Sequence, residues 1–417
     1  VQEGNRRALM AGFNYALTLE LSRRPYQLES MQRVNGDYRQ ITGVEAVAMA
    51  MATLATGTKT ACLVSGYPIT PASAILHECA KLAEFGVTLF QAEDEIAAIC
   101  ACIGAAYGGK LALTCSSGPG LDLKSESLGL AVVTELPLVL IDVQRAGAST
   151  GMPTKTGQSD LNQVLFGRHG EAPLPVIAAR SPADCFNTVI EAFRLAIKYM
   201  TPVIVLMDAY LANAAEPWFI PEVETLELPD IQYYRHEKPF SRESGLGRSW
   251  NIPGSKEHIH QLGGLEKQGD SGQISYDANN HQHMVTLRAQ KIANIVQEYP
   301  ALSLEGSANA SVLLVGWGST YGSLLAASAR CEAEGLPIAV LHLRHLNPLP
   351  SDLGTLLREF KHVLVAELNT GQLCQIIRGQ YLVDAQAINQ CNGQPFHITD
   401  LVKHIFARVN DGAELHA

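Results

Sequence analysis

The sequence predicts an α/β protein in which a doubly wound parallel sheet is followed by a smaller α/β domain. Between residues 43 and 207, short apolar runs alternate with segments whose apolar residues recur at helical spacing. The short runs are apolar on both faces, as strands are when helices cover both sides of a parallel sheet. A second alternation begins near residue 283. At 417 residues the chain is also too long for one ordinary core, so two or three domains are expected.

The first domain is expected over residues 39–225. Its short apolar runs and helix-periodic segments follow one another in the order that an open, doubly wound sheet requires. The expected strands are 61–65, 87–91, 111–115, 138–143, 176–179 and 203–207, and the expected helices are 44–55, 71–85, 94–107, 124–133 and 182–199.

Three further segments complete the expected organisation. Residues 1–38 open with an expected helix over 4–20 and contain no strand, so they read as a helical tail. Residues 284–417 form the second domain, with strands expected around 312–315, 338–341 and 362–366. Between the domains, residues 226–283 lose the alternation and become rich in Pro, Gly, His and Gln, which predicts an irregular arm. Three apolar residues in this arm favour a cover over a neighbouring subunit rather than disorder: Trp250, Ile252 and Leu265.

Composition excludes two classes of partner. The formal net charge is −10 and the pI is near 5.7, with no basic stripe, so the long-range field repels nucleic acid. The most apolar stretch, 128–143, is interrupted by Glu135 and Pro137 and is too short to span a membrane. No signal peptide precedes it, and a cytoplasmic location is expected.

The nine cysteines predict free thiols rather than a metal site. They stand at positions 62, 79, 100, 102, 115, 185, 331, 374 and 391, and none forms the C-x-x-C spacing of a zinc or iron–sulfur site. Cys100 and Cys102 are two residues apart in a helical pattern, so their side chains point away from each other. Buried thiols in a reducing cytosol are expected.

The segment 66–71, GYPITP, is the first of four motifs at the carboxyl ends of expected strands, where open α/β sheets bind their ligands. Its second proline suits the first position of a helix, which makes Thr70 a natural N-cap. The Thr70 hydroxyl therefore has two possible roles. It either caps the helix only, or it also donates to a ligand carboxylate near the helix N-terminus.

The second motif, QAEDEIAA at 91–98, places three acids at the start of an apolar helix. Acidic residues in a first turn stabilise the helix dipole, by roughly 0.3–1 kcal/mol each. Three are more than this role needs. Glu95 also begins a face that continues through Ile99 and Cys102 at helical spacing, so its carboxylate is expected to be buried and to need a partner.

The third and fourth motifs are a glycine-rich turn and a loop that begins with an arginine. The turn TCSSGPG, at 114–120, lets backbone approach a flat ring, although such a turn alone is weak evidence of a site. The segment DVQRAGASTGMPT, at 142–154, places Arg145 at the end of an apolar strand before a loop of small and hydroxyl residues. A guanidinium there suits a carboxylate held by two hydrogen bonds.

These four motifs, in this order and between residues 66 and 154, resemble the pyrimidine-binding domain of the 2-oxoacid:ferredoxin oxidoreductase alpha subunit. The resemblance continues through TPVIVLMDAYLA (201–212), the arm segment GLEKQGDSGQISYDANNHQHM and ELNTGQL (367–373), and it covers roughly residues 40–417. The branch that acts on 2-oxoglutarate is the most similar. The resemblance implies a thiamine-diphosphate-binding domain followed by a transketolase C-terminal-like domain, with residues 1–38 as the end of a gamma-type domain.

The resemblance also implies a role for each motif residue. Thiamine diphosphate needs a glutamate that shares a proton with its aminopyrimidine ring, and the family pattern places this role on Glu95, with Glu93 as the fallback. Thr70 and Arg145 resemble the residues that hold the substrate's carboxylate and 2-oxo group, and Thr154 resembles a further substrate contact. The remaining cofactor-binding positions implied are Tyr67, Pro68, Ile69, Ser117 and Gly118.

The chain lacks part of the machinery that this family uses. Thiamine enzymes hold the diphosphate through magnesium with a GDG…N motif, and the sequence has only GDS at 269–271. The family supplies Mg²⁺ and a [4Fe–4S] cluster from its beta subunit, with coenzyme A as cosubstrate and ferredoxin as partner. The resemblance therefore implies a site shared between two chain types, in an (αβ)₂ heterotetramer, and no metal ligand on this chain.

The function implied is reversible oxidative decarboxylation of 2-oxoglutarate to succinyl-CoA and carbon dioxide, with reduction of ferredoxin. A pyruvate-type or branched-chain relative is the alternative within the family. A non-catalytic structural subunit is a different class, which loss of Glu95 or Arg145 would have favoured; both residues are present. A complete transketolase-like enzyme would carry its own magnesium motif.

Overall fold

The computed structural model describes residues 2–19, 34–236, 238–242 and 245–414, and these fall into two compact units. The first unit, Val1–Asp37, contains helix α1 (Gln2–Thr18), none of whose residues is buried. This helix confirms the one expected over 4–20, except that residue 20 lies outside the described residues. The second unit, Tyr38–Ala417, contains the three sheets of the described chain and all the motifs.

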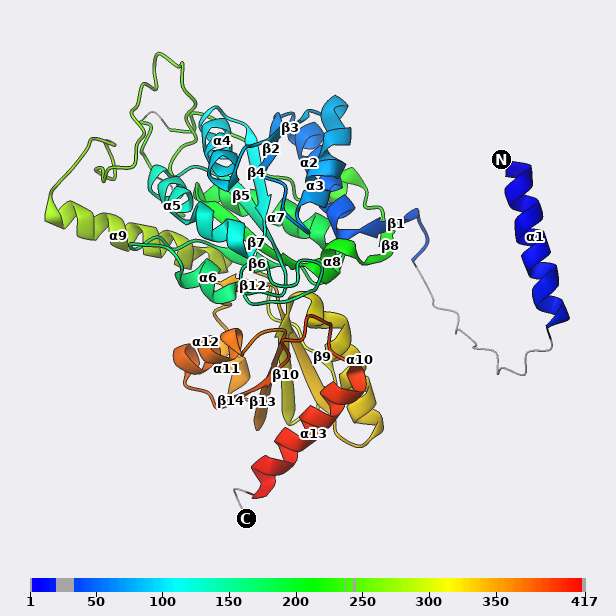
Figure 1. Ribbon diagram of the computed structural model, residues 1–417. Coiled ribbons are helices and arrows are strands. Elements are labelled where there is room, and N and C mark those ends of the chain that lie inside the picture. Colours follow the sequence, from blue (N-terminus) through cyan, green and yellow to red (C-terminus); the bar gives the residue numbers. More distant parts are fainter. Residues whose placement is uncertain (1, 20–33, 237, 243–244, 415–417) are drawn as a thin grey trace. The chain divides into compact units, whose positions relative to one another are not determined.

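The larger sheet has seven strands among the described residues, in the order β12-β6-β7-β5-β4-β2-β3 (Figure 1). Its strands pair in parallel except for β12, which runs antiparallel to β6. The bounds are β2 Cys62–Gly66, β3 Val87–Gln91, β4 Leu111–Ser116, β5 Leu138–Gln144, β6 Val176–Ala178, β7 Pro202–Asp208 and β12 His345–Asn347. All six strands expected in this domain are confirmed to within two residues at each end.

Helices cover both faces of this sheet, which explains why its strands are apolar on both sides. Along β5, Val139 and Ile141 pack toward α2 and α7, whereas Leu140 packs with α5 on the opposite face. Figure 1 shows α4 and α5 on one side of the sheet and α2 and α3 on the other. The helices are α2 Gly43–Thr58, α3 Ser73–Cys79 with the 3₁₀ turn η1 Ala80–Phe85, α4 Glu95–Tyr107, α5 Gly118–Thr134, α6 Leu161–Phe166, α7 Asp184–Tyr199 and α8 Ala209–Asn213.

The smaller sheet has five strands among the described residues, in the order β14-β13-β10-β11-β9. Four of them run in parallel and β9 is antiparallel to β11. The strands are β9 Glu305–Gly306, β10 Val312–Trp317, β11 Ile338–Leu343, β13 His362–Glu367 and β14 Ala385–Asn389, with helices α9 Ala278–Ala293, α10 Tyr321–Ala333, α11 Leu353–Leu357, α12 Gln372–Tyr381 and α13 Ile398–Glu414. This sheet confirms the strands expected around 312–315, 338–341 and 362–366.

One apolar cluster joins the two sheets. It contains Leu140 and Ile204 from the first sheet and Leu313 and Leu341 from the second. Strand β12 also links the two sheets through the backbone. It follows β11 of the smaller sheet in the chain but pairs with β6 of the larger sheet. An additional two-stranded antiparallel ribbon, β1 (Tyr38–Thr42) with β8 (Ala215–Phe219), lies outside both sheets.

The irregular arm packs on its own chain, which corrects the expectation that Trp250 marks a cover over a neighbouring subunit. The Trp250 side chain is 2% exposed and its Nε1 donates to the Ala106 carbonyl oxygen at 2.9 Å. The Tyr233 hydroxyl donates to the Gly109 carbonyl oxygen at 2.5 Å. Leu265, by contrast, is 52% exposed. The Ala106 carbonyl oxygen near the end of α4 also accepts a hydrogen bond from the Gly109 backbone N–H, so Trp250 adds a second donor at this helix end.

A buried glutamate fastens the arm to the end of α5. Arg242 donates two hydrogen bonds to Glu135, of 2.7 and 2.8 Å, and Lys291 of α9 donates a third of 2.8 Å. Arg248 donates to the Thr134 carbonyl oxygen at 3.2 Å. Burial alone would raise the pKa of Glu135, but Lys291 and Arg242 outweigh it and hold that pKa well below its usual range. These cations also offset the negative end of the α5 dipole.

Within the described part of the chain, the helices are either too short or too polar to cross a lipid bilayer.

Candidate active site

The four sequence motifs meet at one edge of the larger sheet. Strands β5, β4, β2 and β3 are consecutive neighbours in that sheet and run in parallel, so their carboxyl ends lie side by side. Each of these strands is followed by one motif. The structure thus confirms that segments up to 88 residues apart in sequence, 66 to 154, share one edge. An edge of this kind is where open α/β sheets bind ligands.

Thr70 does not cap a helix, which corrects one of its two expected roles. Residues 70–72 form a turn that contains a cis Thr70–Pro71 peptide bond, and α3 begins only at Ser73 with Ala72 at the N-cap position. The Thr70 side chain is exposed, together with Tyr67 and Pro68, while Ile69 is half-buried. The hydroxyl of Thr70 is therefore released from capping and is presented at the surface of the site.

Arg145 lies directly beneath this turn. Its Nη1 donates to the Thr70 carbonyl oxygen at 2.6 Å, although 75 residues separate the two in sequence. The Arg145 residue is 6% exposed, and its Nε is buried without a hydrogen-bond partner. The structure thus brings together the two residues that the sequence predicts to hold a substrate carboxylate. One guanidinium nitrogen is committed to shaping the turn.

The three acids at the start of α4 have different positions. Asp94 is the N-cap, and its Oδ1 accepts a hydrogen bond of 2.7 Å from the Ala97 backbone N–H. Glu93 is exposed, whereas Glu95 is 7% exposed and heads the buried face formed with Ile99. The expectation of a buried Glu95 carboxylate is confirmed. Asp94 alone caps the N-terminus of α4, so Glu93 and Glu95 are not needed for that role.

The glycine-rich turn lies against Glu95. A Cβ atom on Gly120 would lie 2.8 Å from Glu95 Oε1 and 2.1 Å from the Ser116 hydroxyl oxygen, so only glycine fits at this position. The hydroxyls of Ser116 and Ser117 are both buried and lack a hydrogen-bond partner. Gly118 begins α5, with Pro119 in its first turn. A carboxylate, two unpaired hydroxyls and a turn that excludes any Cβ are thus assembled where two helices begin.

A buried lysine supports the start of α4, and the sequence prediction missed it. Lys124 is completely buried, and its Nζ donates to the Glu95 carbonyl oxygen at 2.8 Å. Burial lowers the pKa of Lys124. Its position between Leu121 and Leu128, at helical spacing on the apolar face of α5, was the available signal. Lys124 fixes the backbone of the residue whose carboxylate faces Gly120.

A pair of facing carboxyl groups lies beneath the same turn. Asp142, at the end of β5, is completely buried, and neither of its oxygens receives a hydrogen bond from an N–H or O–H group of the described residues. Burial and the facing Asp160 raise the pKa of Asp142 well above its usual range. Burial and Asp122 raise the pKa of Asp160 to about 6. A Cβ atom on Gly118 would lie 2.9 Å from Asp160 Oδ1, so this pair touches the predicted cofactor turn.

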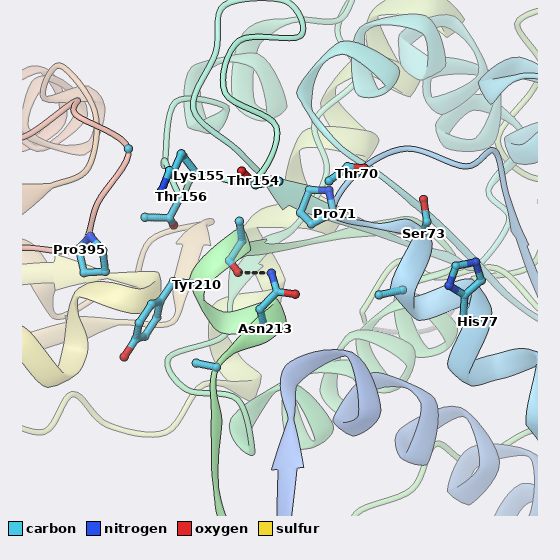
Figure 2. Close-up of a pocket in the computed structure, with 14 residues that line it drawn as sticks. Thr70, Pro71, Ser73, His77, Thr154, Lys155, Thr156, Tyr210, Asn213 and Pro395 are labelled. Carbon is cyan, nitrogen blue, oxygen red and sulfur yellow. Dashed lines mark hydrogen bonds between the residues drawn. The ribbon is translucent and has the colours of Figure 1, made fainter.

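A pocket of about 660 Å³ opens beside Thr70 (Figure 2). Thr154, Lys155 and Thr156 of the loop after β5 line it, and Tyr210 and Asn213 of α8 contribute another wall. None of the described residues that line it is acidic, and Lys155 adds a positive charge. Two of the three predicted substrate contacts, Thr70 and Thr154, are therefore brought together. Arg145, Glu95, Ser117 and Gly118 do not line this pocket.

Metal-binding residues are not grouped in the described part of the chain: no three His, Cys, Asp or Glu side chains there converge on a possible metal position. All nine cysteines lie in this part, and none is in a disulfide. Cys102 is buried and Cys100 is exposed, which confirms that they point in different directions.

The chain matches the family model described as pyruvate flavodoxin/ferredoxin oxidoreductase, thiamine diphosphate-binding, over residues 56–294. It is 47% identical over 413 residues to the 2-oxoglutarate oxidoreductase subunit KorA of Mycobacterium tuberculosis, an alignment that covers 98% of this chain and 63% of that relative. It is 36% identical to the 2-oxoglutarate synthase subunit KorA of Archaeoglobus fulgidus, which covers 74% of this chain and 83% of the relative.

A solved structure is similar over almost the whole chain. This is the 2-oxoglutarate:ferredoxin oxidoreductase from Magnetococcus marinus with 2-oxoglutarate, coenzyme A and succinyl-CoA bound. The TM-score is 0.89 at 33% identity, and the match covers 97% of this chain and 70% of the other. Together with the family model, these similarities assign the fold and the thiamine-diphosphate-binding domain. The chain belongs to the pyruvate flavodoxin/ferredoxin oxidoreductase, thiamine diphosphate-binding family.

Proposed function

We propose that this chain is the part of a 2-oxoglutarate:ferredoxin oxidoreductase that binds the aminopyrimidine of thiamine diphosphate and the substrate carboxylate. The observation that carries the proposal is the contact between Glu95 and the α5 turn. There a buried carboxylate, two unpaired buried hydroxyls and the Gly120 backbone lie together at the carboxyl edge of the sheet. Such a surface suits a flat, polar ring, because glycine permits close approach and the hydroxyls lack other partners.

Each residue then has a defined task. Thiamine diphosphate, when bound, supplies the carbon nucleophile that attacks the 2-oxo group and accepts the electrons left when carbon dioxide departs. Glu95 shares a proton with a nitrogen of the aminopyrimidine, and Ser117 and Gly118 contact the cofactor together with Tyr67, Pro68 and Ile69. Arg145 and Thr70 hold the substrate's carboxylate and 2-oxo group, and Thr154 is a further substrate contact. A guanidinium beside a hydroxyl suits a planar carboxylate.

We propose that a beta subunit completes the site. The sequence has no GDG…N motif, and no group of three possible metal ligands is found among the described residues. These two observations support the assignment of Mg²⁺ and the [4Fe–4S] cluster to another subunit. The relatives are themselves named as subunits. The proposal therefore includes an (αβ)₂ heterotetramer, coenzyme A as cosubstrate and ferredoxin as acceptor. The absence of disulfides supports a reducing, cytoplasmic setting.

The chain spans 63% of the length of its M. tuberculosis relative. The division of the chain into domains is therefore also given as a proposal. Residues 1–38 are proposed as the end of a gamma-type domain, 39–225 as the pyrimidine-binding domain, 226–283 as the arm and 284–417 as the transketolase C-terminal-like domain.

2-Oxoglutarate is favoured over pyruvate and branched-chain 2-oxo acids as the substrate. The relatives' names point to it. The pocket beside Thr70 and Thr154 adds a physical reason, because its lining includes Lys155 and no acidic residue, which suits a second carboxylate.

The experiment is to express the complete alpha subunit with its beta subunit and to measure the reduction of a viologen dye with coenzyme A. 2-Oxoglutarate, pyruvate and 3-methyl-2-oxobutanoate are supplied in parallel. We expect the highest kcat/KM with 2-oxoglutarate. A higher value with either monocarboxylate would replace the substrate assignment, and no reduction with any of them would contradict the enzymatic proposal.

A further inference from the structure

The loop that carries Thr154 ends on the second sheet. This loop leaves β5 at Arg145 and returns at Gln158, which is completely buried. The Gln158 backbone N–H donates to the Leu368 carbonyl oxygen at 3.0 Å, and Asn369 Nδ2 donates to the Gln158 carbonyl oxygen at 2.8 Å. The strand-end segment that receives the loop is the ELNTGQL motif, 367–373, to which the proposed reaction gives no role.

Two glutamine side chains make reciprocal contacts across this junction. Gln158, on the loop side, donates from Nε2 to the Trp317 carbonyl oxygen at 2.8 Å and accepts at Oε1 from the Leu368 backbone N–H at 2.9 Å. Gln372, on the second sheet's side, donates from Nε2 to the Ser159 carbonyl oxygen at 2.7 Å and accepts at Oε1 from the Asn162 backbone N–H at 2.9 Å. Each amide thus uses both its donor and its acceptor on the backbone of the other side. We call this pair the glutamine clasp.

Glu367 makes the second sheet's side of the clasp rigid. Its carboxylate is completely buried and accepts hydrogen bonds from Trp317 Nε1 at 3.1 Å and Asn369 Nδ2 at 3.0 Å. It also accepts from the backbone N–H groups of Leu373 and Cys374, at 2.9 and 3.1 Å, at the start of α12. A carboxylate with four donors in a buried site has one favourable position. The backbone that holds Gln158 is therefore fixed.

The loop held by the clasp forms one wall of the pocket. Thr154, Lys155 and Thr156 line that pocket and face Thr70 across it (Figure 2). Within the loop, the Ala146 backbone N–H donates to the Lys155 carbonyl oxygen at 3.0 Å, so the loop folds back on itself at its start. Its other end is positioned by the contacts of Gln158.

We propose that Gln158 is a positioning residue for the reaction. Through the glutamine clasp, the second sheet sets the position of the Thr154 loop against Thr70 and Arg145, and thereby the placement of the 2-oxo acid. This inference rests on the proposed function for its kinetic consequence. It assigns to the ELNTGQL motif the task of holding a loop that belongs to the first sheet.

Gln158→Met tests this role, because it keeps the side chain's volume and removes both amide hydrogen bonds. In the complex with the beta subunit, we expect kcat/KM for 2-oxoglutarate to fall about 10- to 100-fold, mainly through KM, as misplacement of a substrate contact does. Thiamine diphosphate affinity should stay within about threefold, well under the tenfold change that 1.4 kcal/mol of lost binding energy would produce. Amide hydrogen exchange should quicken over residues 146–157.

Arg344→Met is the matched control. Arg344 follows β11 of the smaller sheet and contacts a helix that covers the larger sheet. It donates to Thr188 Oγ1 at 2.5 Å and forms an ion pair with Asp184. Both partners lie on α7 and not on the loop. We expect both variants to lose thermal stability, because each loses hydrogen bonds between elements of the two sheets. The KM of Arg344→Met and its exchange of residues 146–157 should remain those of the wild type. An equal rise in KM for both variants would mean that general loosening, and not the clasp, affects the site.

Gln158→Glu adds a test by pH. A protonated carboxyl can donate to the Trp317 carbonyl oxygen and accept from Leu368, as the amide does, whereas the ionised form has no donor. Burial raises the pKa of an introduced acid. We therefore expect kcat/KM of Gln158→Glu to approach the wild-type value at low pH and to fall toward that of Gln158→Met as pH rises.

Two outcomes would overturn the inference: wild-type kinetics and exchange in Gln158→Met, or a Gln158→Glu profile parallel to the wild type. If the wild-type complex oxidises no 2-oxo acid, the proposed function fails instead. The exchange of residues 146–157 then still shows whether the clasp holds the loop.

Discussion

At the scale of single residues, Glu95 and Glu93 have the same carboxylate but opposite surroundings. Glu95 is 7% exposed and lies against the α5 turn, whereas Glu93 is exposed. Glu95→Gln keeps the shape of the side chain and removes its proposed proton transfer, so turnover should fall roughly 10²–10⁴-fold. Glu93→Gln, as the control, should change turnover only slightly. Steady-state kinetics of the complete complex measure both. Normal turnover in Glu95→Gln would assign the proton to another residue.

Arg145 combines a structural bond with its proposed substrate contact. Its Nη1 donates to the Thr70 carbonyl oxygen at 2.6 Å, and an ammonium cannot reproduce the planar fork that also reaches a carboxylate. Arg145→Lys should therefore lower kcat/KM about 10- to 150-fold, the equivalent of roughly 1.5–3 kcal/mol for a charge-assisted contact. Thiamine diphosphate affinity, measured by calorimetry, should be unchanged. Lost cofactor binding with normal kinetics per filled site would instead place Arg145 in the cofactor pocket.

The facing carboxyl groups of Asp142 and Asp160 predict a dependence of stability on pH. Burial and the facing Asp160 raise the pKa of Asp142 in the folded chain. Burial and Asp122 raise the pKa of Asp160 to about 6, although Asp142 and Arg145 oppose that shift. A raised pKa means that the folded state binds more protons than the unfolded state. The pair's contribution to the free energy of unfolding is therefore present below about pH 4, and it is lost as pH rises through the pKa values of the folded state.

Asp142→Asn removes the need for a shared proton between the two carboxyl groups. The amide N–H of the introduced Asn can donate to the Asp160 carboxylate and does not ionise. The free energy of unfolding of this variant, relative to the wild type, should increase as pH rises above 4, by at most about 1.4 kcal/mol per pH unit for one proton. Urea unfolding of the two proteins between pH 4.5 and 8, chosen to bracket about pH 6, provides the comparison. A difference that does not change with pH would show that the pair does not share a proton.

Some residues of the site could be predicted from the sequence and others could not. Glu95 could be predicted as buried because the three acids of its motif exceed what a helix N-terminus needs. Lys124 and Gln158 were missed because each acts through a backbone partner far away in sequence, Glu95 and Leu368. The Asp142–Asp160 pair depends on the path of a loop. The helical spacing of Lys124 indicates its burial, but no local pattern specifies the partners in these contacts.

At the scale of elements, the contact between α4 and α5 depends on the absence of a side chain at Gly120. A Cβ there would lie 2.1 Å from Ser116 Oγ and 2.8 Å from Glu95 Oε1, so Gly120→Ala must displace Glu95 or the start of α5. We expect turnover to fall at least about 100-fold, as for a misplaced catalytic group. Gly104→Ala is the control, since nothing lies within 4 Å of its Cβ position in α4.

Gly104→Ala should leave turnover unchanged and stabilise the chain by roughly 0.4–1 kcal/mol, through helix propensity and a less flexible unfolded state. Thermal unfolding and kinetics of the two variants separate the effects. Full turnover in Gly120→Ala would mean that the α5 turn does not position Glu95.

Strands could be predicted more accurately than helix starts. β3 has the predicted bounds, 87–91, because Gly86 precedes a short run of β-branched and apolar residues that ends at Gln91. Helix α5 was expected from 124 but begins at Gly118, because the glycines and proline of the turn suggested a loop. Proline is tolerated in a first helical turn, and Gly120 is needed for a tertiary contact. The turn residues therefore belong to the helix, which sequence alone did not reveal.

At the scale of the whole molecule, the fold class could be predicted and the path of the arm could not. Alternating βα segments specify a parallel sheet wherever they occur. The arm has no such periodicity, and its position is decided by Trp250 against Ala106 and by cations around Glu135, contacts that span more than 100 residues. For the same reason, the apolar cluster that unites the two sheets could not be predicted.

Thiamine diphosphate is proposed to bind between this chain and a beta subunit, with this chain providing half of the site. The most direct test is to titrate the isolated chain, and then its complex with the beta subunit, with thiamine diphosphate and Mg²⁺ in a calorimeter. We expect the isolated chain to be colourless and to bind the cofactor at least about 100-fold more weakly than the complex, since diphosphate contacts of roughly 1.5–3 kcal/mol each are missing. The complex should also acquire the visible absorption of an iron–sulfur cluster. Tight, magnesium-dependent binding by the isolated chain would contradict the divided site.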